Sequence, residues 1–200
     1  MGILVNEAFL PAILTVPPMS DDEFADFCAE HTDLHLEMTA DGQLIVSPPN
    51  HSFTGARNSE IDWQLRTWAK KDRRGIVGDS STGFVLPNGA RRSPDASWTL
   101  RSRVEQLSAE SRNSYWRLCP DFVIELKSHS DRLPTLRLKM EEYLANGASL
   151  GWIIDPESRS VEIYRPGRPP EIRIAPINIE AEAPLTGFIL DLKEIWDPLA

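Results

Sequence analysis

The sequence has little cysteine and no long apolar run, and both absences narrow the class of protein. Its 200 residues include only two cysteines, Cys28 and Cys119, which are too few for a disulfide framework or a cysteine-ligated zinc cluster. We expect both to be buried or half-buried thiols in a reducing cytoplasm. No run of about 18 apolar residues occurs, so we expect no membrane span. The first residues lack the basic start and the apolar stretch of a signal peptide.

Several chemical motifs are also missing. The chain contains no glycine-rich phosphate loop, no Cys-x-x-Cys pair and no His-Glu-x-x-His. Residues 128–131 read Ser-His-Ser-Asp, but these letters are adjacent in the sequence and no nucleophile elbow surrounds them, which argues against a serine hydrolase. This segment either contacts phosphate or caps a helix.

Charge is unevenly distributed along the chain. The net charge is −9, which opposes binding to a polyanion. Residues 1–50 hold nine acidic groups and no Lys or Arg, residues 51–140 hold 16 basic and 10 acidic groups, and residues 141–200 hold 5 basic and 11 acidic groups. Because screening limits the reach of charge to about 10 Å, the basic middle segment matters more for nucleic acid than the total does. The alternative is that these charge blocks only keep the protein soluble.

The local patterns predict one domain over residues 1–200 with an α/β, or mixed α+β, fold. Ser20 and Glu23 form a capping box that starts a short helix, and Asp41-Gly42 is typical of a hairpin turn. Further helices are expected at 53–69 and at 133–146, the second closed by Gly147. Strands are expected at 34–38, 44–46, 76–77, 84–86, 94–99, 122–126, 150–154, 161–164, 172–174 and 188–190, and a surface loop or short helix at 101–117.

The most informative motif lies on the strand at 122–126. Glu125 and Lys127 are two residues apart, so on a strand they share one face with Val123, while Phe122, Ile124 and Leu126 form an apolar face toward the core. Asp95 lies 30 positions earlier, after Pro94. Two carboxylates can hold a hard divalent cation, and a nearby lysine stabilises developing negative charge, as phosphodiester cleavage requires. The alternative is a same-face ion pair between Glu125 and Lys127 on a solvated sheet, which contributes little.

Other residues are candidates around this motif. Glu60 supplies a third carboxylate or is a solvated helix glutamate, and His51 orients a water or a phosphate or only begins a helix. Asp121 binds metal through water or, as we favour, caps a turn. Lys139 reaches the cleft or extends to solvent. The candidates for contacts with a nucleic-acid backbone are basic: Arg57, Lys70, Lys71, Arg73, Arg74, Arg91 and Arg92.

Four motifs in this order resemble the Uma-type family of bacterial restriction-endonuclease-like proteins, within the PD-(D/E)xK nuclease superfamily. They are Pro94-Asp95, then Asp121-Phe-Val-Ile-Glu125-Leu-Lys127-Ser, then Lys139-Met-Glu-Glu-Tyr143-Leu-Ala-Asn-Gly147, and finally Trp152-Ile-Ile-Asp155-Pro156. The resemblance covers about residues 20–195. It implies a restriction-endonuclease-like core, a mixed central sheet flanked by helices, preceded here by the N-terminal helix and hairpin.

The resemblance also implies site roles. Asp95 and Glu125 would be metal ligands, and Lys127 would be the catalytic lysine, which many family members lack at this position. Glu60 matches the helical acidic residue of the superfamily, Lys139 matches a family lysine in the following helix, and the place of His51 before the first long helix also matches. The implied cofactor is Mg²⁺ or Mn²⁺, and the implied partner is DNA.

The resulting hypothesis is a metal-dependent DNA endonuclease in which Asp95, Glu125 and the Leu126 carbonyl bind the cation and Lys127 stabilises the attacking water. Crowding of the two carboxylates should raise the pKa of at least one of them. A homodimer would let two sites cut two strands. One alternative is a non-catalytic interaction module that keeps the nuclease fold and is associated with mobile elements, and another is hydrolysis of RNA or a different phosphodiester.

Overall fold

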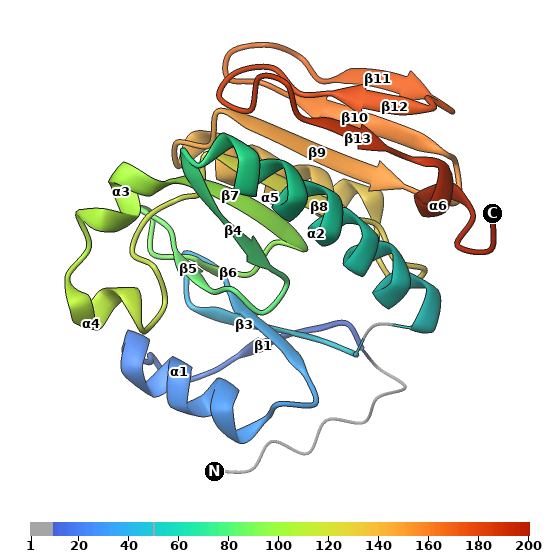
Figure 1. The fold of residues 1–200 in the computed structure, drawn as a ribbon. Coiled ribbons are helices and arrows are strands. Elements are labelled where there is room, and N and C mark those ends of the chain that lie inside the picture. The colour runs from blue at the N-terminus through green and yellow to red at the C-terminus, as the bar shows by residue number, and fades with distance from the viewer. Residues whose placement is uncertain (1–9, 50) are drawn as a thin grey trace.

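The computed structural model describes residues 10–49 and 51–200 and shows a mixed α/β arrangement with two main sheets (Figure 1). The larger sheet has six strands in the order β11-β10-β9-β8-β7-β4. Their bounds are β4 (Gly75–Asp79), β7 (Ala96–Leu100), β8 (Phe122–Leu126), β9 (Leu150–Asp155), β10 (Ser160–Tyr164) and β11 (Glu171–Ile174). Only the central pair, β8 and β9, is parallel, and it requires a crossover, which helix α5 (Leu133–Ala145) provides. This mixed sheet confirms the predicted fold class.

The smaller sheet is built largely from the N-terminal third of the chain. Its five strands lie in the order β1-β3-β2-β6-β5, with bounds β1 (Ala12–Thr15), β2 (His35–Met38), β3 (Gln43–Ser47), β5 (Phe84–Val85) and β6 (Arg91–Arg92). Alternation along β2 sets its two faces, because Leu36 and Met38 are buried with Phe24 of helix α1 (Asp21–Glu30). Glu37, between them, therefore points to the opposite side of the sheet.

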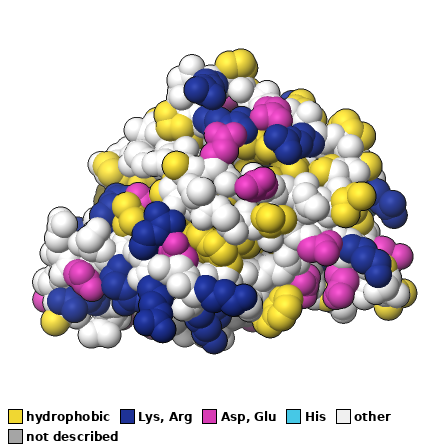
Figure 2. Space-filling model, turned by 45° about the horizontal axis from the view of Figure 1, so that its top comes forward, with side chains coloured by type: hydrophobic (Ala, Val, Ile, Leu, Met, Phe, Trp, Pro, Cys, Tyr) yellow, Lys and Arg dark blue, Asp and Glu magenta, His cyan; other side chains and the backbone are white. Residues whose placement is uncertain are grey.

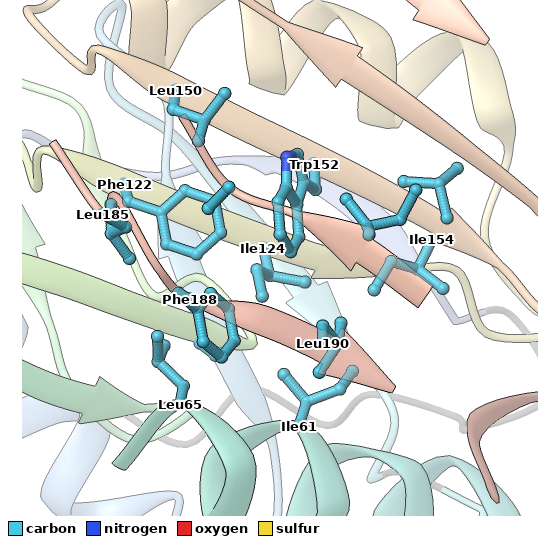
Figure 3. Packing of buried hydrophobic residues seen from close by; sticks show 14 of the residues in the cluster. Ile61, Leu65, Phe122, Ile124, Leu150, Trp152, Ile154, Leu185, Phe188 and Leu190 are labelled. Carbon is cyan, nitrogen blue, oxygen red and sulfur yellow. The ribbon is translucent and has the colours of Figure 1, made fainter. Parts of the chain in front are cut away.

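Two apolar layers cover the larger sheet. On one face lie α2 (Ser52–Asp72), the hairpin β12 (Asn178–Glu180) and β13 (Ile189–Asp191), and α6 (Lys193–Trp196). Figure 3 shows this layer, in which Leu65 of α2 lies beside Phe188 and Ile61 lies beside Leu190, with the rings of the sheet beyond them. The rings of Trp152 and Phe188 stack at 5.9 Å between centroids. On the other face, Met140 and Tyr143 of α5 pack against a cluster that includes Val123.

The alternating pattern of β8 therefore has a structural basis. Phe122, Ile124 and Leu126 belong to the α2 layer, whereas Val123 lies toward α5, so Glu125 points toward α5 as well. The prediction that Glu125 shares a face with Val123 is confirmed. Both faces of β8 are buried, however, so this strand does not border an open surface.

Most predicted elements are present. The capping box is formed, with the Glu23 amide donating to Ser20 Oγ at 3.2 Å, and Gly147 has a φ of +110° after α5. The polar stretch at 101–117 contains two short helices, α3 (Arg101–Glu105) and α4 (Ala109–Arg112). Strands β1, β6 and β12 were missed, because each is short and its pattern carries no local signal. Within the described part of the chain, no helix is both long and apolar enough to cross a membrane.

Candidate active site

Pairing of β7 with β8 brings Asp95 beside Glu125. The two strands run antiparallel with Ala96 opposite Ile124, so the same register places Asp95 opposite Glu125, on the same face. The Leu126 amide donates to Asp95 Oδ2 at 2.8 Å, and Asn58 Nδ2 of α2 donates to Oδ1 at 2.8 Å. The 30-residue separation in sequence thus becomes a cross-strand neighbour pair, and the Asp95 carboxylate is held by two separate segments, β8 and α2.

The lysine that contacts Glu125 is Lys139. Its Nζ lies 2.8 Å from Glu125 Oε1 and 3.0 Å from Glu37 Oε1, so one ammonium bridges two carboxylates. Glu125 is only 3% exposed. Its Oε1 lies within ion-pair distance of Lys139 Nζ, but no group among the described residues donates it a hydrogen bond of good geometry. The Lys139 side chain does not extend to solvent, because α5 crosses this face of the sheet and directs the side chain inward to Glu125 and Glu37.

Glu37 was missed by the sequence analysis and connects the site to the smaller sheet. Its Oε1 accepts from the Ser93 amide at 2.8 Å, and its Oε2 lies 3.4 Å from Arg92 Nη1. Arg92 Nε in turn lies 2.6 Å from Glu142 Oε2 on α5. We call these six residues the charge cluster: Glu37, Arg92, Asp95, Glu125, Lys139 and Glu142. The only local clue to Glu37 was an acidic residue between two apolar strand positions, which is common on solvated strands.

The electrostatics of the charge cluster follow from burial. Burial raises the pKa of Glu125, the Lys139 ammonium opposes that rise, and the charges of Asp95 and Glu37 add to it. Burial also raises the pKa of Asp95, against the hydrogen bond from Leu126 and the charge of Lys139. The expected elevated pKa is present, but burial contributes more to it than crowding of the two carboxylates.

In Glu37 and Lys139, nearby charges outweigh the effect of burial on the pKa. Burial alone would raise the pKa of Glu37, but Lys139, Arg92 and the Ser93 amide outweigh it and hold that pKa below its ordinary value. Burial would lower the pKa of Lys139, but Glu125 and Glu37 outweigh it and raise that pKa. Lys139 is therefore a permanent cation at neutral pH.

The donor set fits a divalent cation of the magnesium type. The charge cluster contains four carboxylates and two cationic side chains, so it carries an excess of two negative charges when all are ionised. Among the described residues, no group of three or more His, Cys, Asp or Glu side chains is placed so that it could hold a metal ion. Mg²⁺ does not need one, because it keeps several waters and is bound by one or two carboxylates together with substrate phosphates. Asp95, Glu125 and the carbonyl of Leu126 would hold it.

Lys127 is not part of the charge cluster. Strand β8 ends at Leu126, and Lys127 Nζ reaches Glu157 Oε2 at 2.8 Å and Asp155 Oδ1 at 3.8 Å. The alternative ion pair between Glu125 and Lys127 is therefore not formed, because each has a different partner. Lys127 lines a pocket of about 360 Å³ at the start of α2, together with His51, Phe53, Thr54, Arg57 and Glu157. We call it the helix-start pocket.

Two further candidate residues point away from Asp95. Glu60 accepts a hydrogen bond from Gln64 at 2.8 Å, and Gln64 pairs with the Asp191 backbone of β13. Asn58 and Glu60 are two residues apart, about 200° around the helix, so the residue that α2 directs at Asp95 is Asn58. Asp121, at the other end of β8, accepts from the Leu100 amide and from Arg103, both at 2.8 Å, which is the structural role favoured from sequence.

The predicted basic contacts divide into two groups. The prediction that Arg91 and Arg92 contact nucleic acid is wrong, because both are buried in ion pairs. Arg91 lies 2.6 Å from Asp21, and Arg92 belongs to the charge cluster. Lys70, Lys71, Arg73 and Arg74 are exposed at the end of α2, about 18 Å or more from Asn58 by helix rise. Arg57 is the one that lies near the site. Figure 2 shows one face of the molecule. Lys and Arg side chains gather on its lower left, the side where Figure 1 draws α3 and α4.

Comparisons with known proteins identify the family. The family model Uma2, described as "Putative restriction endonuclease", matches residues 21–193. The chain belongs to the Uma2 family. The resemblance inferred from the four motifs is thus confirmed, and every residue of the charge cluster lies inside the matched region.

A solved structure supports the fold of this Uma2 chain. The crystal structure described as that of "a putative nuclease belonging to DUF820 from Anabaena variabilis ATCC 29413" has a TM-score of 0.75. It is 22% identical, and the match covers 92% of this chain and 100% of that chain. At this identity the likeness shows a shared fold. No curated protein matches the chain.

Proposed function

We propose that this Uma2 protein hydrolyses phosphodiester bonds of DNA with the help of Mg²⁺ or Mn²⁺. The observation that carries the proposal is the charge cluster: Asp95 and Glu125 lie side by side on neighbouring strands, beside an ammonium that remains protonated. Burying carboxylates is costly unless they have a function or compensation. The excess of negative charge is the property that a divalent cation would neutralise.

Each residue has a role in this proposal. When bound, the cation would supply Lewis-acid stabilisation of the phosphoryl group and a water of lowered pKa. Asp95 and Glu125 hold it, and Asn58 together with the Leu126 amide orients the Asp95 carboxylate. Lys139 is already protonated, so it stabilises negative charge that develops on the phosphate and does not accept a proton. The contacts therefore favour Lys139, and not Lys127, as the lysine of the chemical step.

Glu37 and Arg92 act as positioning residues. Glu37 fixes the Lys139 ammonium from the side opposite Glu125, and Arg92 fixes Glu37 and Glu142. Without Glu37, the ammonium would have one carboxylate partner and more freedom to follow it. Because small displacements of a charged group cost much of its effect on a reaction, we expect this support to matter for rate more than for substrate affinity.

A non-catalytic module with the nuclease fold remains the second candidate. The observation that favours it is that Asp95 and Glu125 already have partners within the protein: two hydrogen bonds on Asp95 and one ion pair on Glu125. A purely structural ion cluster would also give each of these carboxylates a partner within the protein. In such a cluster the excess of carboxylates over cations would be balanced by protons, in line with the raised pKa values of Asp95 and Glu125.

Plasmid cleavage separates the two. We expect supercoiled DNA to be nicked or linearised with Mg²⁺ or Mn²⁺ and not with EDTA, and Glu125→Gln to abolish cleavage. Glu162→Gln is the matched control, because Glu162, on β10, is equally buried but pairs with Arg137, outside the charge cluster. Cleavage that survives Glu125→Gln, or wild-type protein that cuts neither plasmid nor single-stranded DNA in either metal, would refute the proposal. Cleavage of RNA and not of DNA would show that the substrate is RNA.

A further inference from the structure

The helix-start pocket has unused hydrogen-bond donors. Helix α2 begins after His51, whose side chain makes no capping hydrogen bond, and the first backbone bond of the helix runs from the Gly55 amide to the His51 carbonyl at 3.0 Å. Within the described residues, the amides of residues 52–54 therefore have no acceptor. Free amides at the start of a 21-residue helix favour an anion.

The side chain of Thr54 is a second, independent indication. Thr54 is only 8% exposed and lines the pocket, and its hydroxyl makes no hydrogen bond to any part of the chain that the structure describes. The hydroxyl itself is not among the fully buried atoms without a partner, so it remains accessible from the pocket that Thr54 lines. Its position among cationic residues suggests that the missing partner is an acceptor from outside the protein.

Arg57 is held in place with its outer nitrogens free. Its Nε donates to the Ile195 carbonyl at 2.7 Å, and its guanidinium lies 5.9 Å from the centre of the Phe53 ring. No carboxylate lies within ion-pair distance of Arg57 in the described residues, unlike Arg66 on the same helix, which pairs with Asp62 at 3.0 Å. A pre-positioned guanidinium without a counter-ion is suited to a phosphate oxygen.

The one anion already in the pocket is Glu157. Its carboxylate lies 2.8 Å from Lys127 Nζ and 3.0 Å from His129 Nδ1, and these hydrogen bonds lower the pKa of Glu157 to about 2. Glu157 belongs to a surface turn and its side chain is 56% exposed, so it can swing away from the pocket at little cost. It thus occupies, on Lys127 and His129, positions that an incoming anion would take.

The pocket also adjoins the charge cluster. Lys127 follows Glu125 by two residues, and Asn58, which holds Asp95, is one helical turn beyond Thr54. The ring of Phe53 is 53% exposed at the pocket, a surface on which a base can stack. Donors for a phosphate and a ring for a base therefore lie together beside the carboxylates.

We propose that the helix-start pocket binds a phosphate group of the nucleic acid next to the one that is cleaved, with the neighbouring base on Phe53. The phosphate accepts from the first amides of α2, the Thr54 hydroxyl and Arg57, and displaces Glu157 from Lys127. This inference rests on the proposed function for the identity of the ligand. The same chemistry suits a backbone phosphodiester and a terminal 5′-monophosphate.

Binding can be measured without cleavage, in EDTA, on the Glu125→Gln background. A fluorescent single-stranded oligonucleotide is titrated by anisotropy, once with a 5′-hydroxyl and once with a 5′-phosphate. Arg57→Gln should weaken binding about tenfold, the effect of one charge-assisted hydrogen bond. Arg66→Gln, the matched control on the exposed side of α2, should change it less than about twofold, as a distant screened charge would. Glu157→Gln should tighten binding roughly threefold to tenfold, because it removes a competing charge.

Inorganic phosphate is the second probe. In amide spectra it should shift the resonances of residues 52–55 in the parent protein and not in Arg57→Gln. Tighter binding of the 5′-phosphorylated strand assigns the pocket to a terminal phosphate, and equal binding assigns it to the backbone. Equal losses for Arg57→Gln and Arg66→Gln, or phosphate that shifts no resonance of the helix start, would overturn the proposal. If wild-type protein fails to cleave DNA while Arg57-dependent binding persists, only the proposed hydrolysis is refuted.

Discussion

Replacing Lys139 by methionine tests the charge cluster most directly. Methionine keeps much of the aliphatic length of lysine but removes the ammonium that lies 2.8 Å from Glu125 and 3.0 Å from Glu37. Removing one partner of a buried ion pair costs about 3–5 kcal/mol, because a buried charge is left without compensation. At about 2–4 °C per kcal/mol for a chain of this size, the melting temperature should fall by roughly 6–20 °C.

Lys127→Met is the matched comparison. The nearer partner of Lys127, Glu157, is more than half exposed, and the second, Asp155, lies at 3.8 Å, so we expect a loss close to that of a surface salt bridge, about 0–1 kcal/mol. Urea unfolding followed by tryptophan fluorescence suits both variants, since the chain has six tryptophans and Trp98 and Trp152 are fully buried. The spacing of Glu125 and Lys127 in the sequence would predict the larger loss for Lys127, whereas the structure predicts it for Lys139.

The loss in Lys139→Met should also depend on pH. Without the ammonium, the pKa of Glu125 in the folded protein rises further above the value of about 4.3 in the unfolded chain, and the pKa of Glu37, which Lys139 helps to hold low in wild type, rises as well. The folded state then binds more protons than the unfolded state, so the free energy of unfolding decreases as pH rises. The difference from wild type should be smaller at pH 5 than at pH 8. Equal losses for the two lysines, or a Lys139→Met loss that does not change with pH, would refute this account of the site.

Three further predictions follow from the same contacts. Mg²⁺ should raise the melting temperature more at pH 8 than at pH 5, because the raised pKa values of Asp95 and Glu125 let protons compete with the cation at the lower pH; equal shifts would count against a shared site. Arg92→Met should cost about 3–5 kcal/mol in urea unfolding, and Arg74→Met, at an exposed pair, about 0–1 kcal/mol; similar losses would contradict the burial of Arg92. Asn58→Ala should lower the free energy of unfolding by about 1–2 kcal/mol and weaken Mg²⁺ binding measured by calorimetry, since Asp95 Oδ1 loses its donor; unchanged metal affinity would remove Asn58 from the site.

The sequence predicted the parts of the site that depend on local pattern. Alternation along residues 122–126 identified the buried strand and the face of Glu125, and the Pro-Asp motif identified its cross-strand neighbour. The lysine could not be assigned in the same way. The two-residue spacing predicts Lys127 beside Glu125, but β8 ends at Leu126 and the Lys127 ammonium pairs with Glu157, so a helix residue, Lys139, pairs with Glu125.

Contacts between distant segments were beyond local reasoning. Asn58 and Glu37 reach the site from α2 and β2. The residues next to them in the sequence are the same as around an ordinary solvated position. Arg92 shows the complementary error. A pair of arginines in a basic segment resembles a nucleic-acid contact, and only the fold reveals that Glu37 and Glu142 enclose it. Charge in a sequence indicates neither burial nor partner.

The bridge made by Glu37 has a consequence for how this protein matures. Glu37 lies on a sheet formed mainly by the first third of the chain, whereas Glu125 and Lys139 come from the middle, so Lys139 gains its second carboxylate only when the two sheets dock. An intermediate with the six-stranded sheet formed and β2 detached would hold Lys139 and Arg92 without Glu37. The site therefore has its final set of charges only in a molecule whose two sheets are docked, which links competence for chemistry to that long-range contact.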